Sequence, residues 1–295
     1  MMAGLLAALL AMTLVASVLR WRGRSEADLK LAADFGARTL GWWIVVLGFM
    51  PAVLAGGVAV LAVFALAAIL TWLEFGSVTT VALRPCDRWW AVPLVVAHFL
   101  AVAGVLPGPG WWPGFATVAL ILLTTIATKR SERLARIGWQ LLGFAYCVLL
   151  LSAAPAIAFC FGARSLFFVI VVVQVGDVLQ YISGKTWGRR PLAPWLSPKK
   201  TWEGLLGGLA GTALIGAALA PLIHSGRGFG LRCGLGLGLA GTIGGLAMSA
   251  VKRRWGVKDF GSVLPGHGGL LDRLDSLTAA VAVAYVWLVW CGAVG

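Results

Sequence analysis

The chain has 295 residues, of which 60% are hydrophobic and 12% are charged, and its mean hydropathy is +0.92. This composition excludes an ordinary soluble enzyme and a disordered chain. Because a helix needs about 20 apolar residues to cross ~30 Å of hydrocarbon, the length leaves room for about ten membrane spans. The formal net charge of +13 comes from basic residues between the apolar runs, which indicates lipid or nucleotide phosphates as partners rather than nucleic acid.

Ten apolar runs follow one another along the chain, and we expect each of them to form a transmembrane helix. The first run precedes its basic cluster Arg20–Arg24, whereas a cleaved signal peptide carries its positive charges first, so we expect a retained anchor. The sequence therefore predicts an all-α polytopic membrane protein with about ten transmembrane helices. The predicted spans are residues 2–19, 40–56, 58–73, 90–106, 112–128, 139–161, 166–182, 205–223, 231–249 and 277–293.

The basic residues between the spans predict which loops face the cytoplasm. If the amino terminus lies outside, all but three of the 24 lysines and arginines fall in cytoplasmic segments, the exceptions being Arg164, Arg227 and Arg232. The positive-inside rule predicts such an asymmetry for a correct topology. Both long polar motifs of the chain then face the cytoplasm.

Small residues four positions apart occur in the eighth and ninth predicted spans. We expect these glycines to let the two spans pack backbone against backbone. The pairs are Gly204/Gly208, Gly207/Gly211, Gly234/Gly238 and Gly241/Gly245. The amino-terminal half offers little comparable chemistry, because its acidic residues Glu74 and Asp87 lie at a span end and in a loop.

Five of the eleven acidic residues lie between positions 177 and 275. A carboxylate near a bilayer is costly unless a cation or a proton compensates its charge. Asp177 follows the wholly apolar run Leu166–Val173, so we expect it at membrane depth. It is a candidate for metal or substrate binding, with a structural ion pair to a basic neighbour as the alternative.

A basic loop follows Asp177. Its tripeptide Gly184-Lys185-Thr186 is not the end of a P-loop, because Leu179 stands where the earlier glycine is required and no buried strand precedes it. Further on, Ser197-Pro198 predicts a turn, and Thr201 is placed to cap a following helix. Open helix-start amides together with Lys199 and Lys200 would make a phosphate cradle, although such a loop can also serve only to fix topology.

The second polar motif runs from Ser249 to Ser276. Its segment Pro265–Gly269 cannot be regular helix, and its glycines permit the backbone to approach a ligand closely. Asp272 and Asp275 stand three residues apart at the start of the last span, so on a helix they share one face and can share a hard divalent ion. The alternatives are a plain charge cluster at a helix start and, for His267, an ordinary loop histidine.

At these residues the sequence resembles the phosphatidate cytidylyltransferase (CDP-diacylglycerol synthase) family. The run from Ser249 to Asp275 matches that family's signature of a serine, a Lys-Arg pair, a Lys-Asp pair, Pro-Gly-His-Gly-Gly and Asp-Arg-x-Asp. The block Ser197–Gly204 and the region of Asp177 resemble two further blocks of the family. The close resemblance covers about residues 176–276, and the pattern Val178–Tyr181 is more similar to a divergent subgroup.

The resemblance implies a nucleotidyltransferase that transfers CMP from CTP to phosphatidic acid, with Mg²⁺ and in some cases a second cation as cofactor. It implies amino-terminal transmembrane helices in residues 1–165 and a catalytic transmembrane region in residues 166–295. The implied location is a bacterial inner (plasma) membrane with the motif loops in the cytoplasm. The sequence leaves the oligomeric state open, with a homodimer as one option.

The resemblance also implies roles for individual residues. The metal ligands would be Asp177, Asp272 and Asp275, and Lys200 would join them as a catalytic residue. The substrate-binding residues would be Lys185, Ser197, Lys199, Ser249, Lys252, Arg253, Lys258, His267, Gly268, Gly269 and Arg273.

Two departures from the family pattern keep other functions open. Gly245 and Met248 stand where the family has an aspartate and a glutamate. The first alternative is therefore a catalytically weakened or silent relative that binds or assembles in the membrane. A lipid transporter is the second alternative. It should show paired helix interruptions in both halves, whereas here the polar motifs lie only in the carboxyl-terminal half.

Overall fold

The computed structural model describes residues 48–79, 85–105, 118–119, 121, 130–261 and 268–290, together with residues 13, 17 and 21. The chain divides into two compact units, Met1–Leu54 and Ala55–Gly295. The second unit contains every element and contact discussed below. The predicted division into amino-terminal helices (residues 1–165) and a catalytic region (residues 166–295) is a division by function, and it stays a prediction.

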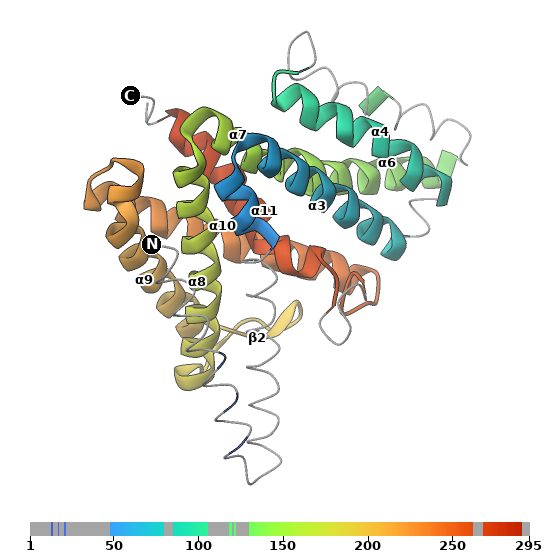
Figure 1. Ribbon diagram of the computed structural model, residues 1–295. Coiled ribbons are helices and arrows are strands. Elements are labelled where there is room, and N and C mark those ends of the chain that lie inside the picture. The colour runs from blue at the N-terminus through green and yellow to red at the C-terminus, as the bar shows by residue number, and fades with distance from the viewer. Residues whose placement is uncertain are drawn as a thin grey trace. The chain divides into compact units, whose positions relative to one another are not determined.

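The second unit is built from helices and one small hairpin (Figure 1). The π-helix η1 and the 3₁₀-helix η2 each continue an α-helix. The elements in chain order are α3 (Gly57–Val78), α4 (Pro85–Val102), α6 (Arg130–Phe144), η1 (Ala145–Leu150), α7 (Ala153–Phe161), α8 (Ala163–Trp187), β1 (Pro191–Ala193), β2 (Ser197–Thr201), α9 (Trp202–Leu219), η2 (Ala220–Ile223), α10 (Arg227–Arg254) and α11 (Leu271–Trp290).

Among the described residues, six helical segments are long and apolar enough to cross a membrane. They are Gly57–Val78, Glu132–Phe161, Ala163–Trp187, Trp202–Ile223, Arg227–Arg254 and Leu271–Trp290, and each overlaps one of the predicted spans. Ala91–Val102 is a shorter apolar helix at the fourth predicted span. The predicted spans 2–19 and 112–128 lie mostly outside the described residues, whereas residues 48–56 of the predicted span 40–56 are described and are helical from residue 48 to residue 55. The all-α polytopic architecture is thus supported, whereas the count of about ten spans stays a prediction.

Helix α9 packs against both α8 and α10, and glycines form the closest approaches. On the side of α10, Gly216 and Gly230 each face the other's carbonyl oxygen, and Gly234 faces that of Thr212. Gly234 and Gly238 therefore join the two helices as predicted. The glycines of α9 at 204, 207, 208 and 211 pack instead against Gln180, Ser183, Leu179 and the backbone of α8. Their predicted assignment to the contact with α10 is wrong.

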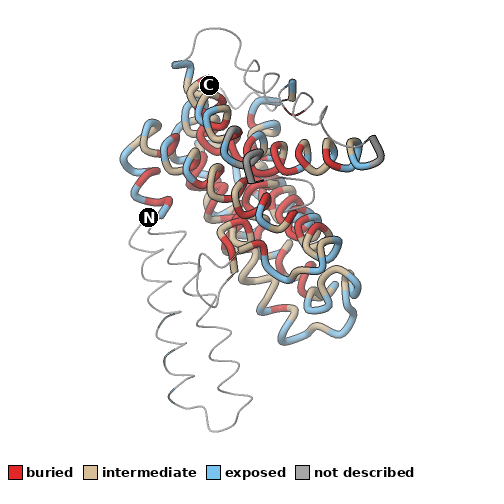
Figure 2. Tube along the Cα trace, turned by 90° about the vertical axis from the view of Figure 1, so that its right-hand side faces the viewer, coloured by how far each residue is buried: buried red, intermediate tan, exposed pale blue. Residues whose placement is uncertain are grey.

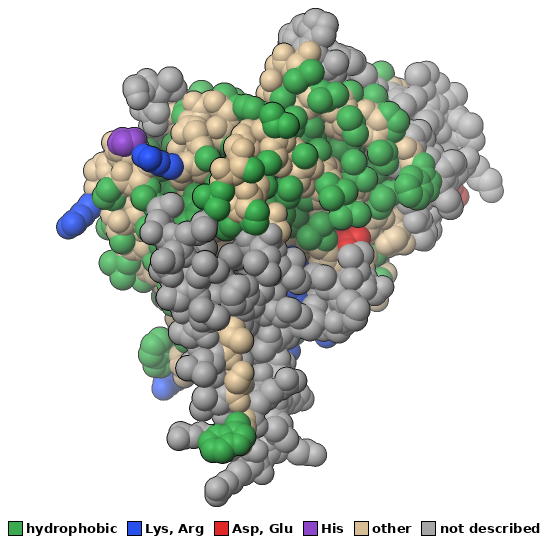
Figure 3. Space-filling model, in the orientation of Figure 1, with side chains coloured by type: hydrophobic (Ala, Val, Ile, Leu, Met, Phe, Trp, Pro, Cys, Tyr) green, Lys and Arg blue, Asp and Glu red, His purple; other side chains and the backbone are tan. Residues whose placement is uncertain are grey.

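The burial pattern follows these helix contacts. Figure 2 shows buried positions alternating with exposed ones along the helices, and α8 is the helix with the longest buried run, Ser165–Ile170. Large apolar side chains are exposed on α9 and α10, among them Leu206, Leu214, Leu239 and Ile243. Figure 3 shows hydrophobic side chains spread over the described surface of one face, with few charged side chains among them. Such a surface is stable against lipid rather than water.

The segment between α8 and α9 forms an antiparallel hairpin, in which Pro191 pairs with Thr201 and Ala193 with Ser197. The sequence predicted only a loop with a turn here. Thr201 caps α9 as predicted, because its Oγ1 accepts a hydrogen bond from the Gly204 amide at 3.1 Å. The cap and the pairing fix the strand that carries Lys199 and Lys200.

Candidate active site

The carboxylate of Asp272 joins three segments of the second polar motif. Its Oδ1 accepts a hydrogen bond from Lys252 Nζ at 2.7 Å, in an ion pair whose side chains are only 13% and 8% exposed. Its Oδ2 accepts hydrogen bonds from the amides of Phe260 at 2.8 Å and Gly269 at 3.0 Å. Lys252 comes from the end of α10 and Asp272 from the start of α11, so this carboxylate joins the two helices and holds Phe260 and Gly269 beside them.

Asp275 lies one turn further along α11. Its Oδ1 accepts a hydrogen bond from the Ser276 amide at 2.7 Å, and its backbone carbonyl accepts one from the hydroxyl of Tyr146. The ammonium groups of Lys252 and Lys200 attract its carboxylate, whereas Asp272 repels it. Asp275 therefore shares one electrostatic environment with Asp272 and two lysines.

Because Gly245 on α10 has no side chain, the end of Lys200 can occupy the space beside it. A Cβ on Gly245 would lie 2.9 Å from Lys200 Nζ and 3.8 Å from Asp275 Oδ2. The hairpin thus delivers an ammonium group from β2 into the contact between α10 and α11. Lys199 is exposed, whereas Lys200 is only half-exposed.

Glu74 on α3 is a site residue that the sequence reasoning missed. It is 6% exposed, and its two carboxylate oxygens accept hydrogen bonds of 2.8 Å from the amides of Leu270 and Leu271 at the start of α11. The signal available in the sequence was an acidic residue near the end of an apolar span, which should have a specific partner. Tyr146 is a second missed residue, and it lies in a π-helix, a feature that is frequent at functional sites.

Asp177 lies in a different place from the other two aspartates. It lines a pocket of about 240 Å³ formed by α8, α9 and α10, together with Gln180, Gly241 and Thr242. Gln180 donates a hydrogen bond to Thr242 Oγ1 at 2.9 Å across this pocket. The pocket adjoins α11, because a Cβ on Gly241 would lie 3.5 Å from Ser276 Cβ.

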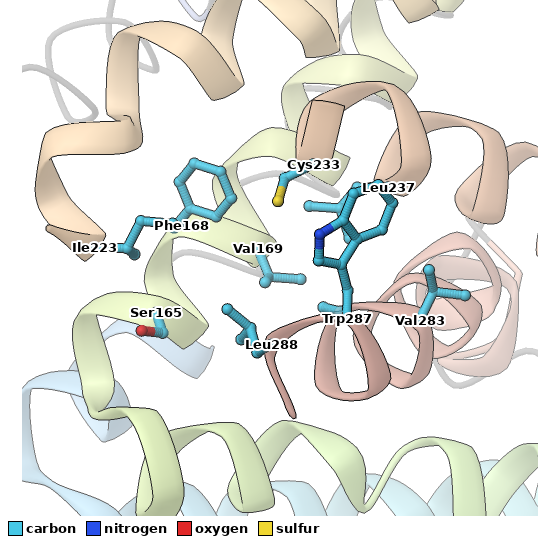
Figure 4. Close-up of a pocket in the computed structure, with 10 residues that line it drawn as sticks. Ser165, Phe168, Val169, Ile223, Cys233, Leu237, Val283, Trp287 and Leu288 are labelled. Atoms are coloured by element: carbon cyan, nitrogen blue, oxygen red, sulfur yellow. The ribbon is translucent and has the colours of Figure 1, made fainter. Parts of the chain in front are cut away.

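A larger pocket, of about 340 Å³, lies nearer the other ends of α8 and α11 (Figure 4). Its lining is almost wholly apolar, with Phe168, Val169, Leu237 and Leu288 among the residues that Figure 4 shows around it. Its lining holds no cation and only two side-chain oxygen or nitrogen donors, the Ser165 hydroxyl and the Trp287 indole nitrogen, which is too little to compensate the charge of a triphosphate. The candidate site is therefore the polar cluster at the start of α11.

The predicted site residues divide into those that meet at this cluster and those that do not. The cluster contains Lys200, Lys252, Gly268, Gly269, Asp272 and Asp275. Ser249 lies beside it, with its Oγ donating to the Gly245 carbonyl at 2.7 Å. Arg253 is exposed and donates to the carbonyls of Leu196 and Val257, and Arg273 and Ser197 are half-buried. Lys185, Lys199 and Lys258 are exposed, and His267 lies outside the described residues.

The predicted cluster of three metal-binding carboxylates is not seen. Among the described residues, no three Asp, Glu, His or Cys side chains form a group that could hold a metal ion. Asp177 lies in its own pocket, and both oxygens of Asp272 already accept hydrogen bonds. A smaller set of ligands still suits Mg²⁺, because this ion binds through one or two carboxylates plus substrate phosphates. The carboxylate available for this is that of Asp275, which points toward the space beside Gly245.

Comparisons with known proteins give the family. Residues 36–291 match the model of the cytidylyltransferase family. The chain is 31% identical to the uncharacterized protein YnbB of Escherichia coli (strain K12), over 98% of each chain. It is 33% identical to a phosphatidate cytidylyltransferase of Pseudomonas aeruginosa, over 66% of this chain and 72% of that one. It is 43% identical to one of Brucella abortus, over 43% of this chain and 47% of that one. The residues of the polar cluster and these matches together show that the chain belongs to the cytidylyltransferase family.

Proposed function

We propose that the protein transfers CMP from CTP to phosphatidic acid, giving CDP-diacylglycerol and pyrophosphate. The observation that carries this proposal is the meeting of Lys200 and Lys252 with Asp272 and Asp275 at one end of the helix bundle. The relatives named phosphatidate cytidylyltransferase support the same substrates. With this end of the bundle at the cytoplasmic face of an inner membrane, lipid would arrive laterally and CTP from solution.

The reaction needs positioning and charge compensation rather than a covalent nucleophile. A phosphate oxygen of the lipid attacks the α-phosphorus of CTP, and the bond from that phosphorus to the leaving pyrophosphate breaks as the new one forms. The residues of the cluster must therefore hold two polyanions together and compensate the charge that develops on pyrophosphate. Lys200 would supply an ammonium group for this purpose, and Lys252 would balance the charges of Asp272 and Asp275.

A bound Mg²⁺ would neutralise phosphate charge and polarise the phosphoryl oxygens. Asp275 is the residue best suited to hold it, together with phosphate oxygens of CTP. Asp272 instead holds the backbone of Phe260 and of Gly269 through its hydrogen bonds. Asp177 would contribute a further charge from the adjoining pocket, where it can face the lipid phosphate or a second cation.

A catalytically silent relative is the second candidate, and one observation favours it. Gly245 brings no carboxylate where the family has an aspartate, and the end of Lys200 lies beside it, so Asp275 has no second acid next to it to share a cation. Such a protein would bind or assemble in the membrane without turnover.

An assay of the purified full-length chain in detergent or nanodiscs separates the two candidates. With CTP, Mg²⁺ and phosphatidic acid, we expect release of pyrophosphate together with an equal amount of CDP-diacylglycerol. Chelation of Mg²⁺ should abolish both products, because two polyanions would then meet without a compensating cation. A folded sample that forms neither product under these conditions would favour the silent relative.

Restoring a carboxylate at position 245 tests the assignment of the cation to Asp275. We expect Gly245→Asp to lower the half-saturating Mg²⁺ concentration roughly tenfold relative to Gly245→Ala, because a second carboxylate would stand beside Asp275. The alanine variant is the matched control, since it adds the same Cβ against Lys200 without a charge. Titration of activity with Mg²⁺ measures the effect. Equal Mg²⁺ requirements in the two variants would contradict the assignment.

A further inference from the structure

Glu74 connects α3 to the start of α11 and to both flanks of the segment 262–267. Besides its hydrogen bonds with Leu270 and Leu271, its carboxylate lies directly against two glycines. A Cβ on Gly261 would lie 2.8 Å from Glu74 Oε1, and one on Gly269 would lie 2.5 Å from Glu74 Oε2. Any larger residue at either position would displace this carboxylate.

The neighbours of Glu74 on α3 hold the same region. The ring of Phe75 stacks on that of Phe260, with 6.1 Å between the centroids and 26° between the planes. Ser77 Oγ donates to the Phe260 carbonyl at 3.4 Å. The end of α3 thus contacts residues 260 and 261 before the segment and residues 269 to 271 after it. Asp272 bonds the amides of Phe260 and Gly269 from the other side.

The charge of Glu74 suits this place. A carboxylate at the amino end of a helix is stabilised by the orphan amides and by the helix dipole, and hydrogen bonds to an ionised acceptor are stronger than neutral ones. If Glu74 had only a structural role as a helix cap, it could equally well lie at the start of any other helix. This one caps the helix whose first two turns carry Asp272 and Asp275.

We propose that Glu74 is a positioning residue of the active site. It fixes the start of α11 and the residues on either side of the segment 262–267, so that the Mg²⁺–CTP complex can bind. The inference rests on the proposed function. Glu74 acts through Gly269, Leu270 and Leu271 and touches neither substrate. Its loss should therefore weaken the binding of CTP while leaving the binding of phosphatidic acid unchanged.

The test compares Glu74→Gln and Glu74→Asp in the full-length protein. The glutamine places an amide donor against a backbone amide, and the aspartate keeps the charge on a shorter side chain. We expect the KM for CTP and the Kd of Mg²⁺–CTP to rise roughly tenfold or more for Glu74→Gln and less for Glu74→Asp. The KM for phosphatidic acid should stay within about twofold of the wild-type value.

Two control variants distinguish a positioning effect of Glu74 from a general loss of stability and from the mere loss of a negative charge. Glu132→Gln removes the same charge from an exposed site on α6 and should change neither constant. Phe64→Leu leaves a defect in the fully buried packing of α3 and should lower Tm without separating the two KM values. A wild-type protein that binds no CTP would overturn the proposed function and this inference with it. If the wild type binds CTP and Glu74→Gln binds it equally well, or if both KM values change together as in Phe64→Leu, only the inference is overturned.

Discussion

Replacement of Asp272 by asparagine is expected to lower the turnover number by about 10²- to 10³-fold and the free energy of unfolding by about 3 kcal/mol. The carboxylate accepts hydrogen bonds from Lys252, Phe260 and Gly269, all of which are donors. An amide of the same shape offers one acceptor oxygen and places two donor hydrogens where acceptors are needed. It also removes the carboxylate that forms the 2.7 Å ion pair with the largely buried ammonium group of Lys252. Steady-state assays and thermal unfolding in detergent measure the two effects.

A double-mutant cycle identifies the source of this loss. Lys252→Met alone should destabilise the protein about as strongly, because it leaves the Asp272 charge unpaired, whereas the double variant should be more stable than the sum of the single effects predicts. Arg254→Met is the matched control, since it removes an exposed positive charge from the same end of α10 and should change stability by less than about 1 kcal/mol. Additive effects of the two replacements would contradict a buried ion pair that orders the site.

Local patterns in the sequence predicted the parts of the site that lie close together along the chain. Thr201 was identified as a helix cap from its position before Trp202 and Glu203, and it caps α9. Asp272 and Asp275 were placed at the start of the last span from their spacing, and they lie in the first two turns of α11. Such features depend on neighbouring residues, so a single sequence contains the information.

Contacts between distant segments could not be predicted in the same way. Glu74 meets residues almost two hundred positions away, and nothing in the spacing of charges indicates which helix start a buried acid will cap. The glycines of α9 at 204, 207, 208 and 211 were predicted to face α10, yet they face α8, because a stripe of small residues shows that a close contact exists without showing its partner. The three aspartates were expected around one ion, whereas hydrogen bonds from the loop engage Asp272 and the helix packing places Asp177 in its own pocket.

The two neighbouring lysines of β2, to which the family resemblance assigned different roles, are expected to differ sharply in their contribution to activity. Lys200→Met should lower kcat about 100-fold, because its ammonium group lies beside Asp275 in the contact between α10 and α11. Lys199→Met should lower it by less than about threefold, since Lys199 is an exposed cation that water screens. Steady-state kinetics at saturating CTP and phosphatidic acid distinguish the two variants. Equal losses would mean that the hairpin attracts substrate by its net charge alone, and that the ammonium group beside Gly245 takes no part in the reaction.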